Sequence, residues 1–373
     1  MTIANTSSCR CGYRFCVYLS LRHLTAENFR CLRNVAFEAN PQYNLIHGQN
    51  ASGKTSVLEA IAYLGRGKSF RGASPQDLIC HGADEFLLLG KVDTEARLAT
   101  VGVRNSKEGL VVKIDGDRET SAAALVEILP LQVIDPDVHN LVGGGPEQRR
   151  RYLDWIAFHV EQAYPERWRR FRRALKQRNA ALRDGAAGAA IAAWDREFLE
   201  VAAEVHETRR RVLDIAIGGL EETAEALLGT PVSFEYRQGW TAGQTLEEAL
   251  AAGWERDRLA GSTQVGPQRA ELRLVYDERQ AKRLVSRGQQ KLLACTMILT
   301  ATDVVQTALE RPLLLLLDDP AAELDEQALG RLMNGLFGLG SQIIATALEA
   351  KTLQFPERPA VFHVEQGRLQ QTS

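Results

Sequence analysis

The chain has 373 residues, of which 45% are hydrophobic and 25% are charged, and its formal net charge is −2. This balance is typical of a globular protein with one large or two smaller domains, and it excludes a fibrous or mainly disordered chain. The near-neutral total excludes a uniformly basic protein, and no uninterrupted apolar run approaches the roughly 20 residues of a membrane span.

The first 16 residues differ in character from the rest of the chain. We expect residues 1–16 to be an unstructured extension or an over-extended gene start, because they are polar and precede the first alternation of apolar residues. Three of the six cysteines, Cys9, Cys11 and Cys16, lie there. Free thiols are favoured over a zinc site, which would need four ligands in regular pairs. The first strand is predicted over 18–29.

A glycine-rich segment comes after two further predicted strands, at 34–37 and 43–46. Residues 47–56 read H-G-Q-N-A-S-G-K-T-S and contain the pattern G-x-x-x-x-G-K-[ST]. Apolar residues at helical spacing come next, so the context is strand, loop and helix. Such a loop turns backbone N–H groups toward phosphate oxygens, and the helix N-terminus adds its dipole. The predicted ATP-binding residues here are Gly48, Gln49, Asn50, Ala51, Ser52, Gly53, Lys54, Thr55 and Ser56.

Two side chains of this loop carry specific roles in the prediction. Lys54 would reach the β- and γ-phosphates of ATP, and the Thr55 hydroxyl would hold Mg²⁺. The alternative is a chance match in a glycine-rich loop. The strand before the loop and the helix after it argue against that alternative.

The next segment mixes cations with an aromatic residue. Residues 65–71 read G-R-G-K-S-F-R, which places Arg66, Lys68 and Arg71 around Phe70. This mixture suits contact with a DNA phosphate backbone. A solvated loop with Phe70 tucked beneath it is an equally good interpretation.

An antiparallel meander is predicted over 86–89, 97–103 and 110–114, because apolar runs alternate there with turn residues. A further strand is predicted over 131–134. Gln132, within that strand, is a third candidate ligand of Mg²⁺, beside Thr55 and Asp318.

A change in composition marks a helical block from Pro146 to about Leu228, rich in Ala, Arg, Glu and Leu. From Arg149 to Arg183 there are eleven Lys or Arg residues against three Asp or Glu. Two interpretations stay open: a helical arm with a solvated basic face, or a helix that faces DNA. The candidate DNA contacts in this block are Arg169, Arg170, Arg172 and Arg173.

Two late motifs complete a nucleotide site. An apolar strand at 313–317 ends in Asp318-Asp319, the arrangement of a Walker B motif. Asp318 would hold the Mg²⁺ shell, and Asp319 would polarise the attacking water, so Asp319 and Lys54 are the predicted catalytic residues. Residues 322–325 resemble the D-loop of ABC-type ATPases, and a strand at 342–346 ends in Thr346, where such proteins place a γ-phosphate sensor.

A second anion-binding motif lies 32 residues before Asp318 (318 − 286). Residues 285–290 read V-S-R-G-Q-Q and resemble the ABC signature, here Ser286, Arg287, Gly288 and Gln289. These residues precede a predicted helix, whose N-terminus favours anions. A second phosphate cradle within one chain is redundant. It makes sense if two copies sandwich ATP, each giving a P-loop to one nucleotide and Ser286 to the other.

Five segments, from residue 18 almost to the C-terminus, resemble the RecF family of bacterial recombination-mediator ATPases, relatives of the SMC proteins. They are the opening strand 18–30, the P-loop helix 48–61, the stretch 136–154, the signature 286–290 and the Asp318-Asp319 pair. Arg287 in the signature and Asp319 in place of the usual Glu are both features of that family.

The resemblance implies an α/β fold: an ABC-type P-loop ATPase head, with a mixed sheet core and an antiparallel meander, and an inserted α-helical arm. The implied boundaries are 17–135 and 270–373 for the ATPase lobe and 136–269 for the arm. The implied cofactors are ATP and Mg²⁺. The implied partners are DNA at single-strand/double-strand junctions, RecR, indirectly RecO and RecA, and a second copy of the chain in an ATP-dependent homodimer.

Three features depart from the family pattern. Residues 1–16 have no counterpart in it. Ala51 stands where many relatives have Gly, which is tolerable if its φ is negative. Gln268 stands where His is usual, so the role of that position is open.

Two other classes of function compete with a DNA-binding switch. A transport-type ABC subunit would couple ATP to a membrane partner, but the helical insertion of more than a hundred residues and its cationic face argue against it. An ATPase paired with a nuclease would need an additional metal–carboxylate cluster, and none stands out. We therefore expect a cytoplasmic, weak, DNA-stimulated ATPase with no membrane partner.

Overall fold

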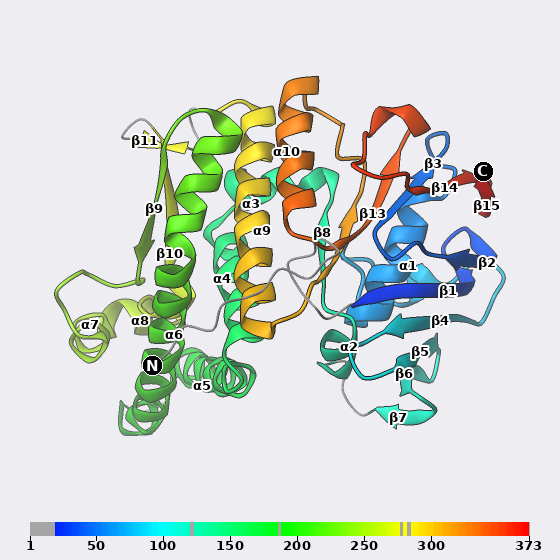
Figure 1. Ribbon diagram of the computed structural model, residues 1–373. Coiled ribbons are helices and arrows are strands. Elements are labelled where there is room, and N and C mark those ends of the chain that lie inside the picture. Colours follow the sequence, from blue (N-terminus) through cyan, green and yellow to red (C-terminus); the bar gives the residue numbers. More distant parts are fainter. Residues whose placement is uncertain (1–18, 120–122, 186–187, 277–278, 282–284, 373) are drawn as a thin grey trace. The chain divides into compact units, whose positions relative to one another are not determined.

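The computed structural model describes residues 19–119, 123–185, 188–276, 279–281 and 285–372 (Figure 1). The expected extension at 1–16 lies outside these ranges. Contacts divide the chain into two compact units. Unit 1 contains the described residues up to Val138 and from Glu310 onward, and unit 2 is His139–Leu309.

Unit 1 contains two six-stranded sheets. The antiparallel sheet has the order β2-β1-β4-β5-β6-β7, with bounds β1 Ser20–Phe29, β2 Leu32–Glu38, β4 Glu85–Asp93, β5 Leu98–Ser106, β6 Gly109–Ile114 and β7 Asp117–Glu119. The predicted meander is confirmed in β4, β5 and β6. Two short helices lie near these strands in sequence: η1, Gln76–Leu78, precedes β4, and α2, Ala123–Ile128, follows β7 and contacts α1.

The second sheet has the order β15-β14-β3-β13-β12-β8, with bounds β3 Tyr43–His47, β8 Leu131–Ile134, β12 Leu314–Leu317, β13 Gln342–Ala347, β14 Ala360–Glu365 and β15 Arg368–Thr372. All neighbours are parallel except β14 and β15. Parallel register places the carboxyl ends of β3, β12, β13 and β8 at one edge, where ligands bind in open α/β sheets. The short helices η2 Pro136–His139 and η5 Ala350–Thr352 come after strands of this sheet, and α10 spans Glu326–Gly338.

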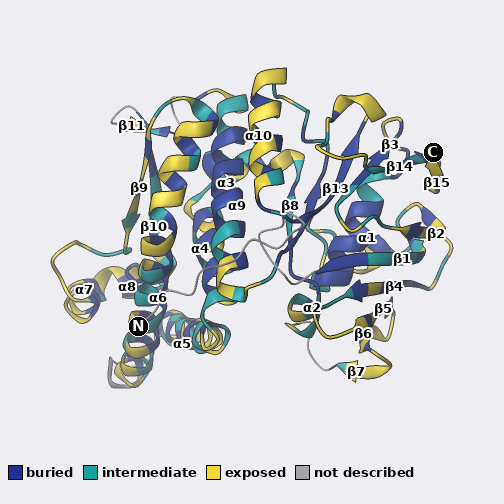
Figure 2. Cartoon of the chain, in the orientation of Figure 1, coloured by how far each residue is buried: buried dark blue, intermediate teal, exposed yellow. Residues whose placement is uncertain are grey.

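Helix α1, Lys54–Arg66, packs against strands of both sheets (Figure 1). Every residue from Val57 to Gly65 is buried, so the helix contacts protein on all sides rather than on one face (Figure 2). A helix that is buried all round belongs to a core. The helix that begins at the P-loop is therefore a rigid part of unit 1.

Unit 2 is mainly helical, as predicted. Its helices are α3 Asn140–Gly143, α4 Pro146–Val160, α5 Tyr164–Arg183, α6 Gly188–Leu228, α7 Leu246–Ala252, α8 Trp254–Ala260, η3 Pro267–Arg269 and α9 Arg287–Leu309. A small antiparallel sheet joins β9 Val232–Arg237, β10 Glu271–Tyr276 and β11 Arg279–Gln280. Residues 270–309 were expected in the ATPase lobe, whereas contacts group them with unit 2, because α9 packs against α6 and α4.

Helix α9 is long and apolar enough to cross a membrane by length and composition alone. However, 72% of its most apolar window is buried inside the protein (Figure 2). A core helix passes the same test, so this helix is explained by its packing within unit 2.

Most of the stretch 136–154 that resembles the family lies in unit 2, where Arg149 connects several elements. Arg149 is buried and donates to both carboxylate oxygens of Glu271 in β10, at 2.8 and 2.9 Å. It also donates to the carbonyls of Leu141, Val142 and Gly144. One guanidinium thereby connects α3, α4 and β10.

A second buried arginine connects further elements of unit 2. Arg209 of α6 donates to Asp154 of α4 at 2.7 Å and to the carbonyl of Pro267. The neighbouring Gln268 donates its amide to the carbonyl of Val265 at 2.7 Å. The Gln268 side chain thus contacts the backbone of its own loop.

We predict that Arg149→Met lowers the stability of the protein by about 3 to 5 kcal/mol, because it leaves Glu271 and three carbonyls without their partner. The urea midpoint measures this change. As a control, Arg258→Ala removes an exposed pair with Glu255 and should cost less than about 1 kcal/mol. Equal midpoints for the two variants would contradict the assigned role of Arg149.

Candidate functional site: a nucleotide cavity at the sheet edge

The P-loop connects the end of β3 to the start of α1. Gly48 and Gly53 have φ values of 153° and 115°, a region that favours glycine. A Cβ on Gly48 would come within 2.3 Å of the carbonyl oxygen of Val364, so no larger residue fits there. The two glycines of the motif are therefore required by the backbone itself.

Ala51 does not meet the condition under which it would replace glycine without strain. That condition is a negative φ, whereas the φ of Ala51 is +61°, in the left-handed region. The turn of the loop requires this conformation, and in it the Cβ of alanine lies too close to the following carbonyl. The departure from glycine therefore costs conformational strain.

Thr55 contacts the other predicted Mg²⁺ ligand, whereas Lys54 contacts the backbone of its own loop. The Lys54 ammonium donates to the carbonyls of Gly48 and Gln49, at 2.7 and 2.9 Å. The Thr55 hydroxyl lies 3.0 Å from both carboxylate oxygens of Asp318. Two segments that are 263 residues apart in sequence thus meet at the edge of the parallel sheet.

The charges at this edge are partly shielded from water. Burial raises the pKa of Asp318, and hydrogen bonds from Thr346 and Thr55 oppose the rise. Burial lowers the pKa of Lys54, while the carboxylates of Asp319 and Asp318 oppose that change. A cation and two carboxylates in such surroundings interact more strongly than they would in bulk water.

A cavity of about 310 Å³ lies over these groups. Its lining residues are Cys31, Asn50, Ala51, Gly53, Lys54, Thr55, Ser56, Arg71, Pro136, Asp318 and Asp319. Among the predicted ATP-binding residues, Gly48, Gln49, Ser52 and Thr346 are absent from this lining. The carbonyls of Gly48 and Gln49 instead hold Lys54.

Thr346 was predicted to sense the γ-phosphate, but its side chain does not line the cavity. Its side chain is fully buried, donates to Asp318 at 2.9 Å and accepts from the backbone N–H of Asp319 at 2.9 Å. It therefore positions the two acids rather than lining the cavity. Asp319, with a φ of +48°, lines the cavity directly.

Arg71, predicted as a DNA contact, lines the nucleotide cavity. The Ser69 hydroxyl organises its loop by donating to Glu59 and accepting from the backbone N–H of Arg71 at 3.1 Å. Glu59 is buried in α1 and also accepts two hydrogen bonds from Arg30. A buried carboxylate thus fixes the loop that brings Arg71 to the cavity.

Arg66 and Gln132 are held away from their predicted roles. The guanidinium of Arg66 donates to the carbonyl of Leu131 at 2.8 Å and to the side-chain oxygen of Gln132 at 3.0 Å. Arg66 is thus occupied within unit 1 rather than presented to DNA. Gln132 pairs with Leu315, well before Asp318 in the strand register, and it does not line the cavity.

Asp135 is a residue at this edge that was not predicted from the sequence. It comes directly after β8, and the strand register pairs the preceding Ile134 with Leu317, directly before Asp318. Burial, followed by the charge of Asp137, raises the pKa of Asp135, and the nearby Asp318 adds to the rise. The sequence feature that could have identified Asp135 is an acidic residue directly after a buried strand.

The signature residues begin α9 in unit 2. The Ser286 hydroxyl accepts from the backbone N–H of Gln289 at 3.3 Å, and the Gln289 side chain accepts from the backbone N–H of Ser286 at 2.9 Å. This reciprocal arrangement is a capping box. Ser286 and Arg287 are exposed, so the helix N-terminus can be approached by a ligand.

The remaining candidate DNA contacts differ in how they are engaged. Arg170 pairs with Glu197 at 3.1 Å and with Glu200 at 3.5 Å. The guanidinium of Arg172 lies over the ring of Trp168, 5.2 Å from its centroid. Arg169, Arg173 and Lys68 are exposed.

Comparisons with known proteins agree with this geometry. The model of the RecF/RecN/SMC N-terminal domain family matches residues 20–370. The DNA replication and repair protein RecF of Pseudomonas fluorescens Pf-5 is 40% identical over 362 residues, which cover 95% of this chain and 99% of that protein. The chain belongs to the RecF family.

More distant relatives extend the comparison. RecF of Thioalkalivibrio sulfidiphilus is 38% identical over 94% of this chain and 98% of that protein. The solved structure described as the recombination mediator protein RecF-ATP in the RecFOR pathway has a TM-score of 0.86 at 22% identity, covering 98% of this chain and all of that one. The Smc head domain of Pyrococcus furiosus has a TM-score of 0.59 at 15% identity, covering 95% of this chain and 96% of that one. The RecF and Smc structures confirm the ABC-type ATPase fold.

We predict that Ala51→Gly raises the stability of the protein by about 0.5 to 1 kcal/mol, because glycine adopts a positive φ without strain. Urea denaturation measures the change. The matched control is Ala62→Gly, the same chemical change within α1, which should lower stability by about 1 kcal/mol or more. A decrease of similar size in both variants would show that Ala51 is not strained.

Proposed function

We propose that this protein is an ATP-dependent DNA-binding switch of recombinational repair in the cytoplasm. It closes as a homodimer on ATP, recognises gapped or single-stranded DNA junctions, and helps to load RecA together with RecO and RecR. Replication restart and the SOS response depend on that activity. The proposal rests on one observation. Lys54, Thr55, Asp318 and Asp319 line the same cavity in a chain of the RecF family.

The residues of the cavity fit Mg²⁺ as well as ATP. The Thr55 hydroxyl and the Asp318 carboxylate are adjacent oxygen ligands, and Mg²⁺ commonly takes only one or two protein oxygens, with water and substrate phosphates completing its shell. When bound, the ion neutralises charge on the β- and γ-phosphates. Thr346 keeps the Asp318 carboxylate in place for this contact.

Hydrolysis would depend on three side chains of the cavity. Lys54 leaves its two carbonyl partners to bind the phosphates, and Arg71 adds a second cation beside them. Asp319 orients the attacking water and accepts its proton. Turnover is slow and stimulated by DNA in this proposal, because hydrolysis serves to open the dimer rather than to drive rapid metabolism.

Dimer closure would use the signature residues of the second copy. Ser286 and the N-terminus of α9 in one copy bind the γ-phosphate held by Lys54 of the other copy. The Ser286 hydroxyl can do this while it caps the helix, because it accepts from Gln289 and keeps its own proton to donate. Loss of the γ-phosphate then removes this contact and the dimer opens.

We predict that Ser286→Ala retains ATP binding but loses ATP-induced dimerisation in analytical ultracentrifugation. Because Ala also removes a helix cap, Ser286→Asp is the control: it keeps the cap but repels phosphate, and should fail to dimerise too. A wild-type sedimentation profile that does not change with ATP would overturn the dimer mechanism.

We also predict that Lys54→Met abolishes ATP binding or turnover, because the ammonium that binds the phosphates is lost.

The DNA part of the proposal has its own test. Binding to gapped, single-stranded and duplex DNA is measured with ATP, with ADP and without nucleotide, at two salt concentrations. We expect the tightest binding on gapped DNA with ATP, and a steep loss with salt because phosphate contacts release counterions. Binding to none of the three substrates would favour an ABC-type subunit that acts on a membrane transporter or another partner.

A further inference from the structure

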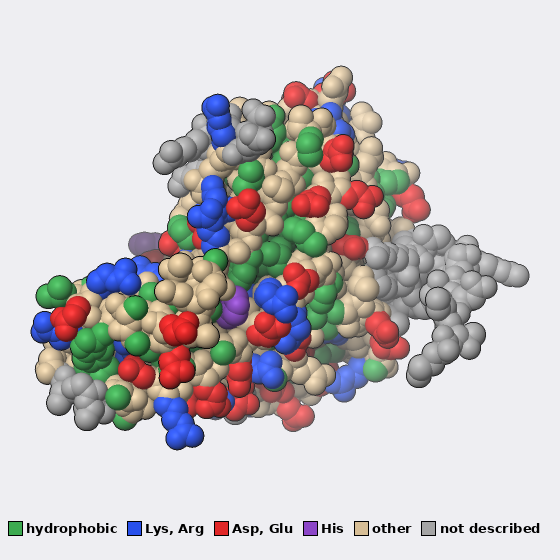
Figure 3. Space-filling view, turned by 90° about the vertical axis from the view of Figure 1, so that its left-hand side faces the viewer, with side chains coloured by type: hydrophobic (Ala, Val, Ile, Leu, Met, Phe, Trp, Pro, Cys, Tyr) green, Lys and Arg blue, Asp and Glu red, His purple; other side chains and the backbone are tan. Residues whose placement is uncertain are grey.

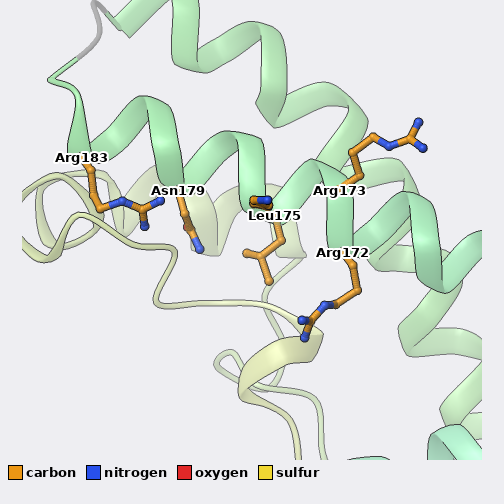
Figure 4. A pocket seen from close by; sticks show the side chains of 6 residues that line it. Arg172, Arg173, Leu175, Asn179 and Arg183 are labelled. Carbon is orange, nitrogen blue, oxygen red and sulfur yellow. The ribbon is translucent and has the colours of Figure 1, made fainter. Parts of the chain in front are cut away.

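Helix α5 of unit 2 borders a groove of about 540 Å³ that the nucleotide chemistry does not use (Figure 4). The lining residues are Arg172, Arg173, Leu175, Lys176, Asn179 and Arg183. Four of the six are cations, one is an amide, and none is a carboxylate. A groove lined in this way selects for an anion.

The polar groups lie along one stripe of the helix. Arg172, Lys176, Asn179 and Arg183 are separated by four, three and four residues, the spacing of a single helix face. With a rise of 1.5 Å per residue, the stripe is roughly 16 Å long. Figure 4 shows Arg172, Asn179 and Arg183 on the same side of α5, beside Leu175, while Arg173 extends to the other side.

The cations of this groove have no acidic partner among the residues that the structure describes, unlike other arginines of the same helix. Arg167 pairs with Glu204 at 3.3 Å, and Arg170 pairs with Glu197. Among the described residues, no carboxylate lies within 4.0 Å of the cationic groups of the groove, which are Arg172, Arg173, Lys176 and Arg183. The groove therefore keeps its positive charge available to a ligand.

The amide at the centre of the stripe is held in one orientation. The side-chain oxygen of Asn179 accepts from the backbone N–H and the hydroxyl of Thr263, at 2.8 and 2.7 Å. Thr263 in turn accepts from Arg178, which is fully buried and paired with Asp257. With its oxygen fixed by Thr263, the Asn179 amide nitrogen is left as a donor for the groove.

We propose that this groove binds the phosphate backbone of DNA, an inference that rests on the DNA-binding function proposed above. A strand lying along the stripe passes roughly five phosphates, at 3.4 Å of axial rise for each. Lys176, Asn179 and Arg183 thereby join Arg172 as contacts along the stripe. The contacts are made to phosphates, so this groove carries no base specificity.

The charge pattern elsewhere supports a local site of this kind. The net charge of the chain is −2, and Figure 3 shows acidic and basic side chains interspersed over the face that it draws. A protein without a broad positive field needs concentrated cations to hold a polyanion. The groove beside α5 supplies such a concentration.

The test uses the full chain and compares two triple variants. Arg172→Ala/Lys176→Ala/Arg183→Ala removes three cations of the groove. Arg196→Ala/Arg210→Ala/Arg258→Ala removes three exposed cations elsewhere in unit 2 and is the matched control. Affinity for single-stranded and duplex oligonucleotides is measured between 50 and 200 mM salt.

We expect the groove variant to bind at least about tenfold more weakly at low salt, with a salt slope smaller by about 2 to 3 because three phosphate contacts are lost. The control should keep the wild-type slope. An unchanged slope in the groove variant, or an equal loss in the control, overturns the inference. Because ATP-induced dimerisation does not involve these residues, its retention shows that the groove variant is folded.

A single isosteric change gives a second test. Asn179→Asp keeps an oxygen for Thr263 but replaces the groove-facing donor with a second carboxylate oxygen. We expect weaker DNA binding with unchanged urea stability, and unchanged binding would contradict the role of Asn179. Wild-type protein that binds no DNA would reject the proposed function as well, whereas wild-type binding with an inactive groove rejects only this inference.

Discussion

The contact between the Thr55 hydroxyl and the Asp318 carboxylate is the interaction on which the nucleotide site depends. It joins the start of α1 to the residue after β12, and it exists because β3, β13, β12 and β8 run in parallel in one sheet. Parallel register brings the loops at the carboxyl ends of these strands to the same edge. The P-loop, the paired acids and Asp135 therefore converge although they come from distant parts of the sequence.

Buried charges fix the loops around that edge. Glu59 lies within a helix that is buried all round, where an unpaired carboxylate would be costly, and it is stabilised by Arg30 and Ser69. This pairing also sets the loop that carries Arg71. Thr346 acts in the same way on Asp318 and Asp319. Several polar residues near the site thus act by positioning other residues rather than by touching a ligand.

Unit 2 uses arginine for two opposite purposes. Arg149, Arg178 and Arg209 are buried and paired; Arg149 joins α4 to β10, and the other two join helices to the segment before β10. Arg172, Arg173 and Arg183 of the same unit are exposed on α5. Composition alone cannot distinguish these groups, since most of them come from one basic stretch. Burial and the distance to a carboxylate separate the arginines that join elements of unit 2 from those that are exposed on α5.

The sequence by itself determined the elements and the chemistry of the nucleotide site. The glycine pattern, the apolar strand before Asp318 and the helical block are local signals, and each appears in the structure at nearly the expected residues. The motifs also sufficed to recognise the family, because each consists of particular residue types at a fixed spacing along the chain.

Only the tertiary structure decided which cations face which partner and which polar groups are buried. Arg66 and Arg71 lie five residues apart in the chain, yet one binds Gln132 and the other lines the cavity. The positive φ of Ala51 and the burial of Thr346 were likewise not evident from the sequence. These features depend on strand register and on contacts between distant segments, which residue type and spacing along the chain do not encode.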